Sequence, residues 1–142
     1  MGGIFALKVC VYAICKNESQ FADRFMNSMS EADYVCVLDT GSSDDTVKKL
    51  RARGAIVGET VVSPWRFDTA RNESLGLIPA DADISCAIDL DEQFHPGWRA
   101  ALERAWQPDT TRARYRYPWS FRPDGSEGMV FWADKIHKNG CY

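Results

Sequence analysis

This sequence has no excess of positive charge and no cysteine pattern typical of a metal site. The formal net charge is −3 and the isoelectric point is near 5.4. This argues against nucleic acid as the main partner, because binding to a phosphate backbone needs a clustered positive field. The five cysteines include no C-x-x-C arrangement, and no histidine pair accompanies them. We therefore expect neither nucleic acid nor a zinc site.

Long apolar runs are absent as well. The run from Ile4 to Cys15 is interrupted by Lys8 and is too short to span a bilayer, so we interpret it as a strand and expect no transmembrane segment. Four cysteines lie inside this and other apolar runs, where cysteine behaves as a small hydrophobe: Cys10, Cys15, Cys36 and Cys86. Reduced, buried thiols favour a cytoplasmic protein.

Glycine-rich phosphate-binding turns are the third absence. The segment Cys15–Glu18, which follows the first apolar run, has none of the glycines of a dinucleotide-binding turn, and no Walker A loop with its lysine occurs. A metal ion must then neutralise the charge of a phosphate bound here, and the planar guanidinium of Arg71 could contact a phosphate oxygen in addition.

Apolar strand-like runs alternate with helical patterns over the first ninety residues. We expect strands at 7–15, 34–38, 55–62 and 84–88, and helices that begin near 16–19, at 43 and at 67, with Ser43 and Asp68 as N-caps. Such alternation implies an α/β fold with a mostly parallel sheet and helices on both faces. Ligands bind at the carboxyl edge of such sheets.

The remaining third has a different character. A short helix with Trp98, Leu102 and Trp106 at helical spacing runs to about 107, and these side chains are expected in the core. Runs at 112–117 and 129–132, joined by a turn-rich segment at 122–128, predict an antiparallel β-hairpin. Three arginines would line one hairpin face, either solvated or with one touching substrate: Arg112, Arg114 and Arg116. We expect one domain over 1–142, with a nucleotide-binding part at 1–95 and a helix and hairpin at 96–142.

Three carboxylates follow the strand at 84–88. Alternation along an extended chain would send Asp89 and Asp91 to the same side, with Leu90 opposite and Glu92 next in line. Two carboxylates held that close repel unless a cation lies between them or one is protonated. Hard oxygen ligands favour Mg²⁺ or Mn²⁺, with substrate phosphates completing the shell. The alternative is a strand end whose acids are simply solvated.

Four ordered blocks together resemble the nucleotide-sugar-binding part of a family 2 glycosyltransferase of the GT-A fold. They are AICKNE at 13–18, VLDTGSSDDT at 37–46, FDTARN at 67–72 and DLDE at 89–92. A single D-x-D is a weak signal, but four blocks in this order over residues 7 to 95 are specific.

The resemblance implies a role for most polar residues in these blocks. Asp39 would accept a hydrogen bond from the imide of a uracil, with Asn17 and Glu18 beside it; the alternative is that Asp39 caps the turn at 42–45. Arg71 would approach the diphosphate or the base. Asp68 would contact the nucleotide or, together with Asn72, hold the loop and helix in place.

The resemblance also implies a reaction. Asp89 would face the ribose and a Mn²⁺ or Mg²⁺ ion that Asp91 ligates, with Glu92 in support. A sugar would pass with inversion from a nucleotide-sugar, which we expect to be a UDP-sugar, to an unknown acceptor. Asp134 would be the general base, and His137 a third metal ligand.

Members of this family continue well past this length on the acceptor side, so we expect a chain that is short or truncated there. This keeps open a binding module that holds a nucleotide-sugar without turning it over. A nucleotidyltransferase is a more distant alternative, because its glycine-rich, basic loop after the first strand is missing.

Overall fold

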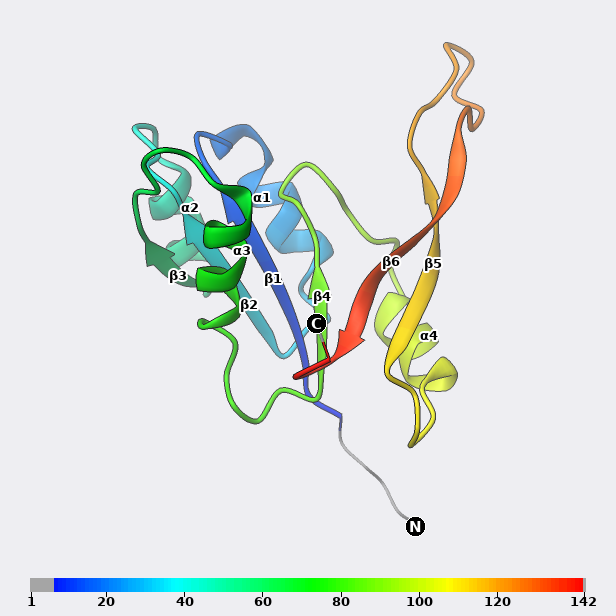
Figure 1. The fold of residues 1–142 in the computed structure, drawn as a ribbon. Coiled ribbons are helices and arrows are strands. Elements are labelled where there is room, and N and C mark those ends of the chain that lie inside the picture. Colours follow the sequence, from blue (N-terminus) through cyan, green and yellow to red (C-terminus); the bar gives the residue numbers. More distant parts are fainter. Residues whose placement is uncertain (1–6, 142) are drawn as a thin grey trace.

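A computed structural model describes residues 7–141 and contains a six-stranded sheet with the order β3-β2-β1-β4-β6-β5 (Figure 1). The strands are β1 (Val9–Cys15), β2 (Tyr34–Asp39), β3 (Ile56–Glu59), β4 (Ile84–Ala87), β5 (Arg112–Pro118) and β6 (Val130–Lys138). The helices are α1 (Ser19–Ser28), α2 (Thr46–Ala52), α3 (Phe67–Leu75) and α4 (Trp98–Ala105). Residues 4–6 of the first apolar run and residue 142 lie outside the described part.

The sheet is parallel in its first four strands and antiparallel in its last two. β1 pairs in parallel with β2 and β4, and β2 with β3, whereas β6 runs antiparallel to both β4 and β5. This confirms the predicted mostly parallel α/β sheet with a C-terminal hairpin. Cys15 pairs with Asp39, so the loops after β1 and β2 leave the same edge of the sheet. The loop after β4 leaves that edge too.

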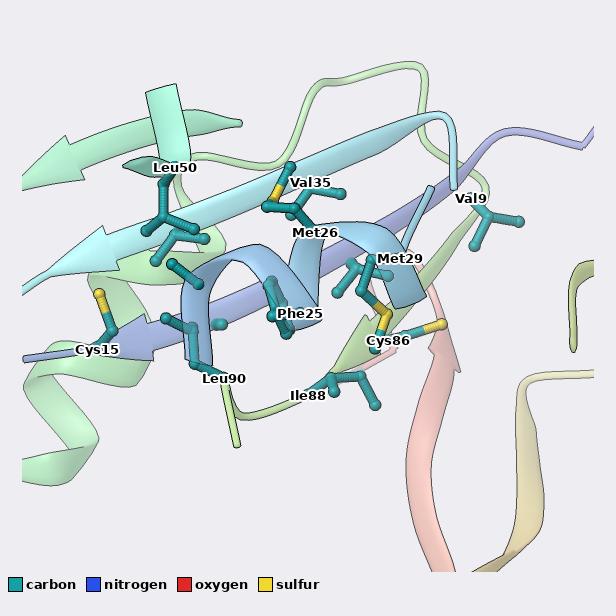
Figure 2. Close-up of a cluster of buried hydrophobic side chains, with 14 of the residues drawn as sticks. Val9, Cys15, Phe25, Met26, Met29, Val35, Leu50, Cys86, Ile88 and Leu90 are labelled. Atoms are coloured by element: carbon teal, nitrogen blue, oxygen red, sulfur yellow. The ribbon is translucent and has the colours of Figure 1, made fainter. Parts of the chain in front are cut away.

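Helices cover both faces of the sheet. On one face, α1, α2 and α4 bury apolar residues against odd-numbered residues of β1. Phe25 of α1 and Met29, which directly follows α1, are fully buried there (Figure 2). Truncating a buried phenylalanine of this kind typically costs about 3–5 kcal/mol. On the other face, residues at the end of α3 and just beyond it pack on a smaller cluster around Cys10, Tyr12 and Cys36. The helix predicted to begin near 16–19 is confirmed.

The predicted core role of the α4 aromatics is also confirmed. Leu102 is buried, and Trp98 and Trp106 are partly buried against the same core. The indole Nε1 of Trp98 donates a hydrogen bond to the Ser28 carbonyl at 3.0 Å, which fixes α4 against the end of α1. The β5–β6 hairpin extends beyond the layered part of the molecule, at the upper right of Figure 1.

Element boundaries differ from prediction where a side chain finds a distant partner. α2 begins at Thr46 rather than at Ser43, because the backbone N–H of Ser43 donates to Asn17 instead of starting the helix. Asp68 is not the N-cap of α3: it lies inside the first turn and pairs with Arg66 at 3.0 Å. β3 spans only 56–59, and β6 runs six residues further than predicted, to 138.

Four of the five cysteines are buried. No cysteine within residues 7–141 forms a disulfide. They fill the core as expected. Among the described residues, no helix is both long and apolar enough to cross a membrane.

Candidate nucleotide and metal site

The loops after β1 and β2 are joined by hydrogen bonds through Asn17. Its side-chain Oδ1 accepts from the backbone N–H of Ser43 at 2.7 Å and of Asp44 at 3.3 Å, and its own N–H donates to Ser42 Oγ at 2.8 Å. Asn17 has a φ of 53°, a left-handed conformation that asparagine tolerates better than most residues. The two predicted blocks at 13–18 and 37–46 therefore form one polar wall at the carboxyl edge of the sheet.

Asp39 is buried at the base of this wall and already has partners. Its Oδ2 accepts from the backbone N–H groups of Gly41 at 3.1 Å and Ser42 at 2.9 Å, and its Oδ1 accepts from the Ser42 hydroxyl and from Cys15 Sγ at 3.4 Å. Burial acts to raise the pKa of Asp39, but these hydrogen bonds outweigh it and hold the pKa below its ordinary value. The carboxylate caps the turn after β2, which is the alternative that the sequence left open. Contact with a base stays a prediction.

The acidic segment after β4 forms a turn rather than an extended strand end. The backbone N–H of Glu92 donates to the Asp89 carbonyl at 3.0 Å, and Glu92 Oε1 accepts from the Asp89 N–H at 2.8 Å. The expected extension through Leu90 and Asp91 is therefore wrong. Leu90 is fully buried beneath α1, as Figure 2 shows, and its burial holds the turn against the core. Asp89 and Asp91 are nevertheless exposed on the outer side, as predicted.

Like charges gather at this turn from two separate loops. Burial and the neighbouring Asp91 and Asp89 carboxylates raise the pKa of Glu18. Burial, Glu92 and Asp91 raise the pKa of Asp89, against the lowering effects of Lys135 and Arg71. Glu18 follows β1 and the other acids follow β4, so the fold itself brings them together. A cation at this position would relieve the repulsion.

The donor set fits a hard divalent cation. The carboxylates of Asp89 and Asp91 make no hydrogen bond or ion pair with other described residues, and both provide the oxygen ligands that Mg²⁺ and Mn²⁺ prefer. Residues 7–141 nevertheless contain no group of three or more His, Cys, Asp or Glu side chains placed to hold a metal ion. The protein thus offers two free carboxylates with Glu18 nearby, and leaves the rest of a coordination shell to a ligand.

Arg71 approaches the acids from α3, on the opposite side from α1. Its guanidinium lies 5.0 Å from the ring centroid of Phe67 and 5.8 Å from that of Tyr12, and its charge lowers the pKa of Asp89. The other polar residues of this block do not join it. Asp68 pairs with Arg66 at the exposed start of α3, and Asn72 is exposed.

The C-terminal hairpin contributes a cation and an aromatic wall that the sequence did not reveal. Lys135 Nζ donates to Glu92 Oε1 at 3.3 Å, and the Tyr117 hydroxyl hydrogen-bonds to Glu92. A cavity of about 250 Å³ lies between the acidic turn and the hairpin, lined by Asp89, Asp91, Glu92, Tyr117, Trp119, Phe131, Ala133 and Lys135. The alternation of tyrosines with arginines at 112–117 was the available signal, since one face is solvated and the other faces the turn.

Asp134 and His137 lie away from the acidic turn. Asp134 is exposed and pairs with Arg112 at 3.8 Å, whereas its neighbours Ala133 and Lys135 line the cavity. His137 is buried, and its Nε2 hydrogen-bonds to the Tyr12 hydroxyl at 2.8 Å. It pairs with Ser85, four residues before Asp89, or about 13 Å along an extended strand. The β6 register therefore separates His137 from Asp89 and Asp91, and the structure does not group them.

The hairpin arginines are exposed, as predicted, and contact of one of them with substrate stays a prediction. Arg112, Arg114 and Arg116 are exposed, and Arg116 pairs with Glu127.

Comparison with known proteins gives structural matches, whereas no protein-family model matches the chain. Glucosyl-3-phosphoglycerate synthase from Mycobacterium tuberculosis in complex with UDP matches 75% of this chain and 43% of its own, at 25% identity and a TM-score of 0.60. Two further structures of that protein also match: its complex with Mn²⁺, UDP and phosphoglyceric acid, and its complex with Mg²⁺ and UDP. Each match covers 59% of this chain and 33% of the other chain, at 28% identity and a TM-score of 0.50.

The chain thus spans between 33% and 43% of the length of these structures. The matching architecture is that of GT-A nucleotide-sugar transferases, with a mostly parallel sheet followed by antiparallel strands. The fold of this chain is therefore the GT-A fold that its sequence blocks predicted.

Proposed function

We propose that this chain is the nucleotide-sugar-binding part of a metal-dependent glycosyltransferase that uses a UDP-sugar. The observation that carries the proposal is that Glu18, after β1, lies within electrostatic reach of Asp89 and Asp91, after β4. These acids lie beside the wall that Asn17 builds with the loop after β2. Solved structures with this fold and 25–28% identity are complexes with UDP and with Mn²⁺ or Mg²⁺, which supports the same ligands here.

Each residue would have a distinct task. Asp89 and Asp91 would hold Mn²⁺ or Mg²⁺, which when bound would neutralise the diphosphate and act as a Lewis acid. Arg71 offers a second positive charge beside Asp89, which suits a diphosphate oxygen. The wall of Asn17 and the turn that Asp39 caps would receive the nucleoside. These assignments rest on position and charge.

The resemblance to family 2 enzymes extends this proposal to the reaction. An acceptor hydroxyl would attack the anomeric carbon from the face opposite UDP, so that configuration inverts. The residues that the fold brings to the acidic turn would serve the donor by holding its diphosphate. A cytoplasmic location and a single domain over 1–142 remain predictions.

A non-catalytic nucleotide-sugar-binding module is the second candidate. The observation in its favour is that Asp134, the carboxylate predicted as general base, pairs with Arg112 and lines neither of the two cavities beside the acidic turn. A donor site without a base would bind a nucleotide-sugar and release it unchanged. Nothing in the structure favours a nucleotidyltransferase in the same way.

Release of UDP from UDP-glucose separates these candidates. The 142-residue chain is incubated with UDP-glucose and Mn²⁺, with a chelator control and with Asp91→Asn as the matched variant, and free UDP is measured by chromatography. An enzyme releases UDP only with the metal, and the variant does so at least about ten-fold more slowly. Saturable binding of UDP-glucose without release indicates a binding module, and the absence of any UDP binding contradicts both.

A further inference from the structure

A groove of about 520 Å³ lies between the acidic turn and β5, beside the proposed donor site. This volume falls within the range of about 300–1,000 Å³ that small-molecule sites occupy. Five of its lining residues are aromatic: Phe94, Tyr115, Tyr117, Trp119 and Phe121. Trp119 and Phe121 are 63% and 64% exposed, so their rings are available to a ligand.

The groove adjoins the smaller cavity at the acidic turn. Both are lined by Asp91, Glu92, Tyr117 and Trp119. Lys135 and Asp89 line only the smaller cavity, whereas Phe94, His95 and Phe121 line only the groove. A ligand in the groove would therefore lie next to the proposed metal and diphosphate position, with Tyr117 and Trp119 lining both spaces.

The charges of the groove do not favour an anionic ligand. Two arginines, Arg24 and Arg116, and two carboxylates line the groove, so the positive and negative charges of its lining are equal in number. Both guanidinium groups already have partners: Arg24 donates to the Asp91 carbonyl at 2.7 Å, and Arg116 pairs with Glu127. Recognition of a phosphate usually needs an unengaged arginine fork or an excess of positive charge.

The polar groups that remain suit hydroxyl groups. The side-chain amide of Gln93 lines the groove, is exposed, and offers both a donor and an acceptor. The Asp91 carboxylate lies at the boundary with the donor cavity. The aromatic faces attract the weakly positive C–H groups of a ligand. Aromatic faces with a few hydrogen-bonding groups match a pyranose ring, which has apolar C–H faces and a hydroxyl rim.

We propose that this groove binds the acceptor, and that the acceptor is an uncharged saccharide that packs on Trp119 and hydrogen-bonds to Gln93. This rests on the proposed transferase function. In the transfer, an acceptor hydroxyl oxygen bonds to the anomeric carbon of the donor sugar. The bond from that carbon to UDP breaks with its electron pair going to UDP, and the hydroxyl proton leaves to water. One of the matching solved structures is a complex with phosphoglyceric acid, which is an anion. The two proteins would therefore differ in acceptor class.

Ligand-observed NMR on the 142-residue chain with UDP and Mn²⁺ tests this. The probes are methyl β-D-glucopyranoside, methyl α-D-mannopyranoside, cellobiose, maltose and 3-phosphoglycerate. At least one neutral saccharide should bind, and 3-phosphoglycerate should bind at least ten-fold more weakly. Trp119→Ala should weaken saccharide binding ten-fold or more, and Trp119→Phe, which keeps a ring, should recover most of it. Trp132→Ala is the matched control, because Trp132 is 67% exposed on the same hairpin but lines neither cavity.

UDP binding is measured in parallel for every variant. If UDP binds with Mn²⁺ but no neutral saccharide binds, or if 3-phosphoglycerate binds better, the acceptor class is wrong and the donor site stands. Equal effects of Trp119→Ala and Trp132→Ala would overturn the placement in the groove. If UDP itself does not bind, the proposed function fails.

Discussion

Glu92 and Lys135, which are forty-three residues apart, form the contact that joins the acidic turn to the C-terminal hairpin. Lys135 Nζ lies 3.3 Å from Glu92 Oε1, the same oxygen that accepts the Asp89 N–H, and the Glu92 side chain is only 8% exposed. Glu92 is therefore neutralised and holds the turn in shape. This leaves Asp89 and Asp91 as the carboxylates that are free to bind a metal ion.

Asn17→Ala should destabilise the protein by about 1–3 kcal/mol, because it leaves the Ser43 and Asp44 N–H groups without their acceptor. It also places an alanine at a φ of 53°. Urea denaturation measures the change. Asn17→Gly removes the same hydrogen bonds, but glycine adopts a positive φ without strain. The difference in unfolding free energy between the two variants therefore gives the cost of the backbone conformation.

The control for this change is Asn72→Ala in α3, where the asparagine is exposed. It should change the free energy of unfolding by no more than about 0.5 kcal/mol. Equal effects of Asn17→Ala and Asn72→Ala would show that Asn17 does not hold the two loops together.

Asp91→Asn should lower the pKa of Asp89 in the metal-free protein, because it removes one of the like charges that raise it. NMR titration of the Asp89 carboxyl carbon measures this directly. A carboxyl whose pKa is raised on folding binds its proton more tightly in the folded state. It therefore adds stability below its ordinary pKa of 3.8, and that stability is lost as the pH rises through the raised value.

A bound metal ion competes with the same proton. Affinity for Mn²⁺ should accordingly fall as the pH drops toward the raised pKa values of Glu18 and Asp89, which lie above the ordinary 4.5 and 3.8. A wild-type Asp89 that titrates at or below 3.8, with no response to Asp91→Asn, would be incompatible with clustered carboxylates.

His137 should control stability rather than metal binding. Burial lowers the pKa of this imidazole below 6.5, so its contribution to stability is present above pH 6.5 and is lost as the pH falls through the lowered value. Denaturation in urea at several pH values should show that loss in the wild type and a flatter profile in His137→Gln. His95→Gln is the control, because His95 is exposed.

The same variant tests the predicted metal role of His137. UDP–Mn²⁺ affinity should stay within about two-fold of wild type in His137→Gln, whereas loss of a metal ligand typically costs ten-fold or more. A ten-fold loss would restore His137 to the metal site.

The three parallel strands at the centre of the sheet were predictable because they are buried on both faces. β1, β2 and β4 read as continuous apolar runs, and their ends were predicted within two residues. The start of α2 and the N-cap of α3 were not, because Ser43 and Asp68 are residue types typical of N-caps but make other contacts. A local pattern cannot show that Asn17 competes for Ser43.

The acidic site was predictable in its residues but not in its shape. Asp89 and Asp91 followed from their spacing, whereas the turn depends on the burial of Leu90 beneath α1. The contributions of Tyr117 and Lys135 depend on the register between β5 and β6, including its irregularity between Ala113 and Tyr115. The same register moves His137 away from the site. Such long-range pairing leaves little trace in a single sequence.

The most direct test of the central claim is calorimetric titration of UDP into the chain with and without Mn²⁺, repeated on Asp91→Ala. Asp109→Ala, which removes an exposed carboxylate in the loop after α4, is the matched control. We expect metal-dependent UDP binding that Asp91→Ala weakens ten-fold or more, equivalent to about 1.4 kcal/mol, and that Asp109→Ala leaves unchanged. UDP affinity that is equal with and without Mn²⁺, and equal in wild type and Asp91→Ala, would contradict a metal-bridged diphosphate at this turn.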